Sequence, residues 1–262
     1  MRQKAKKKLG QNFLIDQNIQ RKIISSLGLS GSDIVLEIGS GRGALTKLLC
    51  EKVFAVYAVE IDEELCASLK EEFKFTRNLK IIHSDFLKLD LLPILKEGKI
   101  KAVGNIPYYI SSPIIERLLQ FNKKISAIFL TVQKEFALRI TAQPGSKAYG
   151  ALSCFVQYYT QPKILFLISR NCFTPTPKVD SAFISLTPRL QKMLPSKEED
   201  LFFKIVRSAF SKRRKTLRNS LKNIVPPGAL KGHAHKRAEE LSLQDFALIV
   251  KITKKLLTKE EL

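Results

Sequence analysis

Residues 35–44 read Val-Leu-Glu-Ile-Gly-Ser-Gly-Arg-Gly-Ala, and this stretch decides the fold. A short apolar run that leads into three closely spaced glycines and then into Ala44 is typical of a buried strand, a tight turn and the start of a helix. Glycines let the backbone turn sharply and approach a ligand, because no Cβ stands in the way. The stretch therefore predicts a strand–turn–helix unit with a ligand at its turn.

Apolar runs alternate with amphipathic segments around this unit. We predict strands at residues 34–38, 53–59, 80–83, 101–104 and 127–132, and helices at residues 44–51, 63–73 and 113–121. Such alternation indicates an α/β fold, a Rossmann-like parallel sheet with helices on both faces. Residues 151–188 are rich in Phe, Ile and Val between prolines, and we expect them to add antiparallel strands.

The character of the chain changes near residue 190. Residues 201–237 hold eleven Lys or Arg and no Asp or Glu. Apolar and basic positions there recur at multiples of four, which is a helical spacing; they are Ile205, Ala209, Leu217 and Leu221, and Arg214, Arg218 and Lys222. We predict an α/β domain over residues 1–190, including a basic N-terminal arm, and a small all-helical basic domain over residues 191–262.

The charge balance points to a polyanionic partner. The chain has 45 Lys and Arg against 24 Asp and Glu, a net charge of +21, which favours nucleic acid or an anionic surface. No apolar run approaches the ~20 residues of a membrane span, and no apolar segment follows the basic residues 1–8, so we expect a cytoplasmic protein with no membrane partner. The four cysteines are far apart, so we expect neither a zinc site nor disulfides; nothing demands an oligomer.

Carboxylates follow the glycine turn at the ends of the next two predicted strands. Glu60 stands 21 residues after Gly39 and can accept hydrogen bonds from both hydroxyls of a ribose. Asp85 can accept from an adenine amino group, with Phe86 or Ile61 against the ring. A dinucleotide fold is the alternative, because residues 39–44 fit G-x-G-x-x-A. The acidic Glu37 and the further strand-end residues favour a ligand that contains a nucleoside but no phosphates over a dinucleotide. S-adenosylmethionine is such a ligand.

Residues 105–108, Asn-Ile-Pro-Tyr, provide the groups that an exocyclic amino group needs in order to attack an electrophile. The lone pair of the adenine amine is delocalised, and two acceptors, the Asn105 side chain and the Ile106 carbonyl, can draw the nitrogen towards a tetrahedral shape. Pro107 stiffens the turn, and Tyr108 can stack on the base. An ordinary turn is the alternative interpretation.

With these residues in place, nearly the whole chain resembles the KsgA-type ribosomal RNA small subunit adenine N6,N6-dimethyltransferase family. The resemblance is carried, in order along the chain, by residues 8–14 (Lys-Leu-Gly-Gln-Asn-Phe-Leu), 37–46, 60–62, 85, 105–108, 132–135, 173–181 and 209–217. Two positions depart from the usual family pattern: Ser40 stands where many relatives carry Pro, and Ile106 where Leu is usual.

The resemblance implies a class I S-adenosylmethionine-dependent methyltransferase, with cofactor contacts at Asn12, Leu14, Gly39, Glu60, Asp85 and Asn105. The residue patterns described above add Gly41, Ile61 and Phe86 to the predicted cofactor site. The resemblance implies that Asn105, Ile106, Pro107 and Tyr108 handle the target adenine, with Phe173 stacking from the other side. It also implies the substrate, two adjacent adenosines in a hairpin loop near the 3′ end of small-subunit (16S-type) rRNA, within a 30S-type particle or its precursor.

Basic side chains at both ends of the chain are the candidates for RNA contact. Phosphate contacts position a protein without specifying bases, and they make affinity steeply salt-dependent; the candidates are Lys6, Lys7, Lys8, Lys212, Arg213, Arg214, Lys215, Arg218 and Lys222. Two rival functions stay open, a large-subunit rRNA adenine methyltransferase of the antibiotic-resistance type and a non-catalytic nucleic-acid-binding factor on the same fold.

Overall fold

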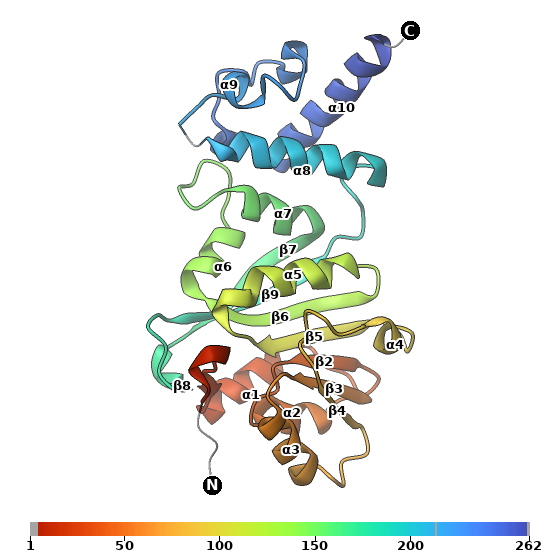
Figure 1. The fold of residues 1–262 in the computed structure, drawn as a ribbon, viewed down its shortest axis with the longest axis vertical. Coiled ribbons are helices and arrows are strands. Elements are labelled where there is room, and N and C mark those ends of the chain that lie inside the picture. Colours follow the sequence, from red (N-terminus) through yellow and green to blue (C-terminus); the bar gives the residue numbers. More distant parts are fainter. Residues whose placement is uncertain (1–4, 213, 261–262) are drawn as a thin grey trace. The chain divides into compact units, whose positions relative to one another are not determined.

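The computed structural model describes residues 5–212 and 214–260, which fall into two compact units (Figure 1). The first unit comprises Met1–Ala137 and Gln161–Pro188, and the second comprises Leu138–Thr160 and Arg189–Leu262. The change of unit after Pro188 lies next to the predicted boundary at residue 190. Residues 138–160 differ from the prediction, because they cluster with the C-terminal helices and not with the α/β domain.

The first unit is built on a seven-stranded sheet in the order β4-β3-β2-β5-β6-β9-β7. Neighbours from β4 to β6 pair in parallel, and β9 pairs antiparallel with β6. The strands are β2 (Ile34–Ile38), β3 (Ala55–Glu60), β4 (Leu79–His83), β5 (Ile100–Asn105), β6 (Ile125–Gln133), β7 (Thr160–Ile168) and β9 (Ser181–Pro188). The predicted α/β fold with a mostly parallel sheet is confirmed.

Helices connect these strands, as the alternation of patterns predicts. They are α1 (Gln17–Ser26), α2 (Ala44–Cys50), α3 (Glu63–Glu72), α4 (Leu92–Leu95), α5 (Ser111–Gln120) and α6 (Lys134–Ile140), the last of which crosses into the second unit. Asp16 and Asp62 cap α1 and α3 by accepting backbone N–H bonds of the first turn. A two-stranded ribbon joins β1 (Phe13–Leu14) to β8 (Phe173–Thr174), so the N-terminal arm is paired with a segment from late in the chain.

The second unit is helical. It contains α7 (Ala151–Tyr159), α8 (Ser196–Ser211), α9 (Leu217–Leu221) and α10 (Leu243–Glu260). Its core includes the fully buried rings of Phe202 and Phe246, and the Tyr158 ring lies 4.7 Å from that of Phe202. No helix among the described residues is both long enough and apolar enough to cross a membrane.

Two expectations about the second unit are wrong in detail. Residues 151–159 form α7 and not a strand, because their apolar positions pack against other helices and the Gln157 amide donates to the carbonyls of Ile140 and Ala142. The basic residues at fourfold spacing do not lie on one helix, since α8 ends at Ser211 and α9 begins at Leu217. Arg214 is therefore in the connection between these helices.

Gly104 shows how tightly the two central strands approach each other. It is paired with Ile38 in the β2–β5 register, and a Cβ at this position would lie 2.7 Å from the Ile38 carbonyl oxygen. We expect Gly104→Ala to force the strands apart, at a cost of about 1–3 kcal/mol and a fall of roughly 5 °C in the midpoint of thermal unfolding. Gly31→Ala is the matched control, because nothing lies within 4 Å of its added Cβ. Equal midpoints for the two variants would contradict this account.

Candidate active site

A cavity lies at the carboxyl ends of β2, β3, β4 and β5. Parallel strands end at the same edge of a sheet, so residues distant in sequence meet there. The N-terminal segment Leu9–Ile15 supplies a further part of the lining. Every residue predicted to bind the cofactor lines this cavity, namely Asn12, Leu14, Gly39, Gly41, Glu60, Ile61, Asp85, Phe86 and Asn105.

The glycine turn is fixed from the next strand. Gly39 N donates to the Val59 carbonyl at 2.8 Å, and Gly41 N donates to Glu60 Oε2 at 2.7 Å. Gly41 has a φ of +57°, which favours glycine, and a Cβ there would lie 3.3 Å from the Phe13 ring. The turn is thus held open towards the cavity, with the arm residue Phe13 close against it.

Glu60 is a buried carboxylate that organises the backbone around it. Besides Gly41 N, its oxygens accept from the N–H groups of Ile61 and Asp62 at 2.9 and 3.0 Å. The side chain is only 5% exposed, and burial raises the pKa of Glu60 although these three hydrogen bonds oppose the rise. Contact with a ribose stays a prediction, and the structure adds that Glu60 also shapes the glycine turn.

Asp85 follows β4 and faces the same cavity. Its Oδ1 accepts from Leu87 N at 2.9 Å, so the carboxylate is held in an Asx turn. Phe86 is buried, whereas Ile61 is 46% exposed. Of the two apolar residues predicted to lie against an adenine ring, Ile61 is the one with free surface.

The side chain of Asn105 is oriented by the N-terminal arm. Its Nδ2 donates to the Asn12 carbonyl at 2.9 Å, which assigns the amide so that Oδ1 is the end not used in this contact. The Ile106 side chain is buried at 2% exposure and anchors the turn in the core. Oδ1 of Asn105 is thus available as an acceptor beside the cavity.

Tyr108 is held at the cavity by its hydroxyl. The Tyr108 oxygen lies 2.6 Å from Ser181 Oγ, and Ser181 is fully buried on β9. Burial is the main reason that the pKa of Tyr108 is raised, so the phenol is neutral at physiological pH. The ring is half-buried, and its position is set by a residue that lies 73 positions later in the chain.

Phe173 lies apart from the other predicted site residues in this structure. Its side chain is 2% exposed, belongs to the core of the first unit and does not line the cavity. The residue sits in β8, where it pairs with Leu14. The structure thus pairs Phe173 with the arm, and its stacking on the target adenine stays a prediction.

Glu37 is not among the predicted site residues. Its acidic side chain two residues before the first glycine is the sequence feature that could have identified it. It lines the cavity and is 2% exposed, and Oε2 accepts from the Thr46 hydroxyl at 2.6 Å. Burial raises the pKa of Glu37 to about 7, with the charge of Glu60 adding to the rise. The protonated form of Glu37 is therefore favoured by the fold.

This shift has a consequence for stability. A carboxyl whose pKa is raised from 4.5 to about 7 on folding stabilises the protein fully below pH 4.5, and that contribution is lost as the pH rises through 7. Glu37→Gln keeps an acceptor for Thr46 but does not titrate. As the pH rises from 5 to 8, we expect the free energy of unfolding of the parent protein to fall relative to that of the variant, by on the order of 3 kcal/mol or less. Thermal midpoints of both proteins at several pH values check this, and parallel curves would contradict it.

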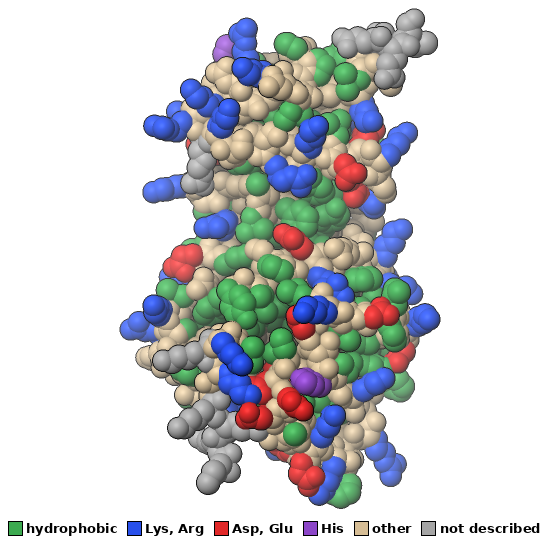
Figure 2. All heavy atoms as spheres, in the orientation of Figure 1, with side chains coloured by type: hydrophobic (Ala, Val, Ile, Leu, Met, Phe, Trp, Pro, Cys, Tyr) green, Lys and Arg blue, Asp and Glu red, His purple; other side chains and the backbone are tan. Residues whose placement is uncertain are grey.

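The predicted RNA-binding residues differ in their surroundings. Lys8 is exposed, as are Lys212, Arg214, Lys215, Arg218 and Lys222. Figure 2 shows many Lys and Arg side chains and few Asp or Glu over the visible face of the second unit, at the top of the view. Arg213 and the Lys7 side chain lie outside the described residues.

Lys6 has two carboxylate partners within the protein. Its ammonium lies 2.7 Å from Asp62 Oδ1 and 2.9 Å from Glu64 Oε1, and the hydrogen bond to Asp62 is the main reason that the pKa of Lys6 is raised. A phosphate would have to displace two carboxylates to reach it. In this structure Lys6 is paired with carboxylates, whereas Lys8 is exposed to solvent, and phosphate contact by either residue stays a prediction.

Metal ligands do not gather anywhere in the described part of the chain. No group of three or more His, Cys, Asp or Glu side chains there could hold a metal ion. His233 Nε2 lies 3.7 Å from Asp245 Oδ1, which gives that histidine a local partner.

The known proteins that this chain resembles are ribosomal RNA methyltransferases. A family model described as "Ribosomal RNA adenine dimethylase" matches residues 2–256. The chain is 42% identical to the ribosomal RNA small subunit methyltransferase A of Clostridium botulinum strain Loch Maree, over 93% of this chain and 92% of the relative. It is 43% identical to the protein of the same name from Geobacillus thermodenitrificans, over 89% and 81% of the two chains.

Two solved structures share the whole fold. A dimethyladenosine transferase from Plasmodium falciparum superimposes with a TM-score of 0.83 at 28% identity and covers 93% of this chain and 98% of its own. The 23S rRNA methyltransferase ErmE superimposes with a TM-score of 0.77 at 25% identity and covers 93% and 100%. Identity to the two small-subunit enzymes is thus well above identity to the 23S enzyme.

Proposed function

The chain belongs to the ribosomal RNA adenine dimethylase family, and from that premise we propose that it transfers methyl groups to two adjacent adenosines in a hairpin loop near the 3′ end of small-subunit rRNA. It is an S-adenosylmethionine-dependent rRNA adenine dimethyltransferase, so each adenosine receives two methyl groups on N6. The substrate is a 30S-type particle or its precursor, and the place of action is the cytoplasm.

One observation carries the adenine half of this proposal. The Asn105 amide is turned by its bond to the Asn12 carbonyl, so that Oδ1 is left for another donor. An adenine N6 amine offers such a donor, and the neighbouring Ile106 carbonyl is the acceptor proposed for its second hydrogen. Two acceptors on one amine localise its lone pair and aim it at an electrophile.

The donor half rests on the strand ends. S-adenosylmethionine supplies a methyl group already activated by its sulfonium. In the proposal, Glu60 accepts from the ribose hydroxyls, Asp85 from the adenine amine of the donor, and Ile61 covers the ring. The glycine turn admits the rest of the molecule, because its backbone carries no Cβ towards the cavity. These residues do fit the group, since each predicted contact lines one cavity.

The residues of this chain act mainly by orientation. A target adenine leaves its stack, which costs least in an unpaired loop, and lies on Tyr108, whose ring is anchored by Ser181. The donor would supply the methyl group, Asn105 and Ile106 would hold the amine in line with it, and the proton released from the amine would pass to water. Proximity and alignment supply most of the acceleration, so no general base is assigned.

The exposed basic residues are proposed to bind the rRNA backbone. Their charge gives affinity without base specificity, and raising the salt concentration should weaken binding steeply. The set comprises Lys8, Lys212, Arg214, Lys215, Arg218 and Lys222, all exposed among the described residues.

A mapping experiment tests the proposed function against its two rivals. The purified protein is incubated with labelled S-adenosylmethionine and with 30S particles that lack the modification, naked 16S rRNA or 23S rRNA, and the products are mapped by primer extension and mass spectrometry. We expect N6,N6-dimethyladenosine at two adjacent loop positions of small-subunit rRNA. Label in 23S rRNA would support the resistance-type enzyme, and donor binding without any labelled RNA would support a non-catalytic factor.

A further inference from the structure

The N-terminal arm, residues 6–15, forms part of the donor cavity but has little structure of its own. It contains a three-residue 3-10 turn at Lys7–Leu9 and the two-residue strand β1. Residues 9–15 nevertheless line the cavity, and the Asn12 carbonyl orients Asn105. Backbone bonds to β8 and Cys172 fix residues 13–15, whereas the position of residues 6–12 depends mainly on side-chain contacts.

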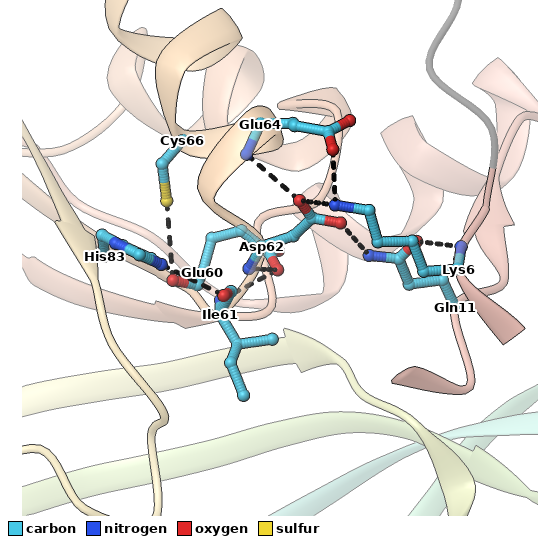
Figure 3. A network of polar contacts seen from close by, with 8 residues as sticks. All are labelled: Lys6, Gln11, Glu60, Ile61, Asp62, Glu64, Cys66 and His83. Carbon is cyan, nitrogen blue, oxygen red and sulfur yellow. Dashed lines mark hydrogen bonds and ion pairs between the residues drawn. The ribbon is translucent and has the colours of Figure 1, made fainter. Parts of the chain in front are cut away.

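The polar side-chain contacts of Lys6 and Gln11 converge on one buried carboxylate, Asp62 (Figure 3). Lys6 Nζ lies 2.7 Å from Asp62 Oδ1, and Gln11 Nε2 donates to Asp62 Oδ2 at 3.0 Å. Lys6 N also donates to Gln11 Oε1 at 2.7 Å. The arm therefore occupies both oxygens of Asp62 and is closed on itself by a third bond.

Asp62 is joined directly to the residue proposed to hold the ribose. Its backbone N–H donates to Glu60 Oε1 at 3.0 Å, and its side chain caps α3 by accepting from Glu64 N at 3.1 Å. In Figure 3 Lys6 and Gln11 reach towards Asp62 at the start of α3, with Glu60 beside it. A continuous set of bonds thus runs from Glu60 through Asp62 to the arm.

Burial decides which of the two carboxylates near Lys6 matters. The Asp62 side chain is 2% exposed, whereas that of Glu64 is 65% exposed. An exposed ion pair contributes little, but a buried charge that loses its partners is costly. Burial would raise the pKa of Asp62, yet the bonds from Lys6 and Gln11 outweigh it and lower the pKa, so the carboxylate stays charged beside the arm.

We propose that Asp62 is a positioning residue that latches the N-terminal arm over the donor cavity and thereby sets how fast the methyl donor is exchanged. This inference rests on the proposed function, because two methyl groups on each of two adenosines require four donor molecules in succession. Residues 9–15 of the arm line the cavity, so release of the arm would widen the cavity for exchange of a used donor. A latch of side-chain bonds holds the donor during transfer and can release it afterwards, as mobile loops do in other enzymes.

The test compares Asp62→Asn and Lys6→Gln with Glu64→Gln. Asp62→Asn keeps an acceptor for the cap of α3 but removes the charge, and Lys6→Gln leaves α3 untouched if the first variant fails to fold. Glu64→Gln is the matched control, because it removes the charge of the exposed partner of Lys6 and leaves the Lys6–Asp62 pair in place. The S-adenosylmethionine off-rate is measured without RNA, and amide hydrogen exchange of residues 9–14 is measured without donor.

We expect Asp62→Asn and Lys6→Gln each to raise the donor off-rate about tenfold and to speed exchange of the arm amides. KM for the donor should rise while kcat at saturating donor is kept, which a general loss of structure would not produce. The double variant should be little worse than Asp62→Asn alone, since both variants break the Lys6–Asp62 pair and the other partner of Lys6, Glu64, is exposed. Glu64→Gln should behave like the parent protein.

Arm exchange in Asp62→Asn and Lys6→Gln equal to that of the parent protein would overturn the latch, and so would a Glu64→Gln effect as large as theirs. Hydrogen exchange of the arm is measured without donor, so it tests the latch independently of whether the protein methylates RNA. Failure of the parent protein to bind the donor, or to label rRNA, would instead count against the proposed function.

Discussion

Asn105→Ala should reduce methyl transfer by about a hundredfold to a thousandfold, the range found when one preorganised polar contact to a reacting centre is removed. Without Oδ1 the target amine keeps its planar, delocalised shape and loses one of two contacts that aim it. Single-turnover transfer to small-subunit particles measures this effect, because it separates the chemical step from donor exchange.

Donor binding should survive in Asn105→Ala, though weakened. The side chain also donates to the Asn12 carbonyl, so its loss loosens one contact of the arm, but Glu60 and Asp85 remain. Isothermal calorimetry with S-adenosylmethionine checks this point. Asn122→Ala, in the turn after α5, is a control of the same chemical type away from the cavity. Near-normal transfer by Asn105→Ala would remove Asn105 from the mechanism.

Glu60→Ala should have the largest effect on the donor, a loss of affinity of at least about a hundredfold. Three backbone N–H groups, of Gly41, Ile61 and Asp62, would lose their acceptor in a buried place, at roughly 1–3 kcal/mol each. The glycine turn would then no longer be fixed from β3, and the proposed ribose contact would be lost at the same time. Calorimetric titration with S-adenosylmethionine measures the affinity.

Two further variants separate shape from charge at this position. Glu60→Gln keeps one oxygen for Ile61 and Asp62 but brings an amide NH2 group towards a backbone donor, so its affinity should lie between those of Glu60→Ala and the parent protein. Glu63→Ala, an exposed carboxylate in the first turn of α3, should bind the donor normally. A dissociation constant for Glu60→Ala within threefold of the parent value would show that Glu60 does not organise the site.

The site also explains why the sequence could place polar residues at the strand ends but could not predict the surroundings of Phe173 and Lys6. Asn105 and Glu60 each end a strand that is recognisable by its own apolar pattern, and parallel strands place their ends together. Phe173 and Lys6 carry no such local signal. Whether an aromatic ring faces a cavity or a core, and whether a lysine meets phosphate or carboxylate, depends on contacts with residues far away in the chain.

The amino-acid sequence by itself determined the strand–turn–helix at residues 34–50, the alternation that makes a parallel sheet and the row of polar residues at its edge, because these follow from local periodicity and backbone preference. Only the tertiary structure decided that residues 151–159 are a helix, that Phe173 is buried, that burial raises the pKa of Glu37 to about 7, and that Lys6 closes the arm onto Asp62, 56 positions away. Burial and long-range pairing are properties of what surrounds a side chain, and a linear pattern does not contain its surroundings.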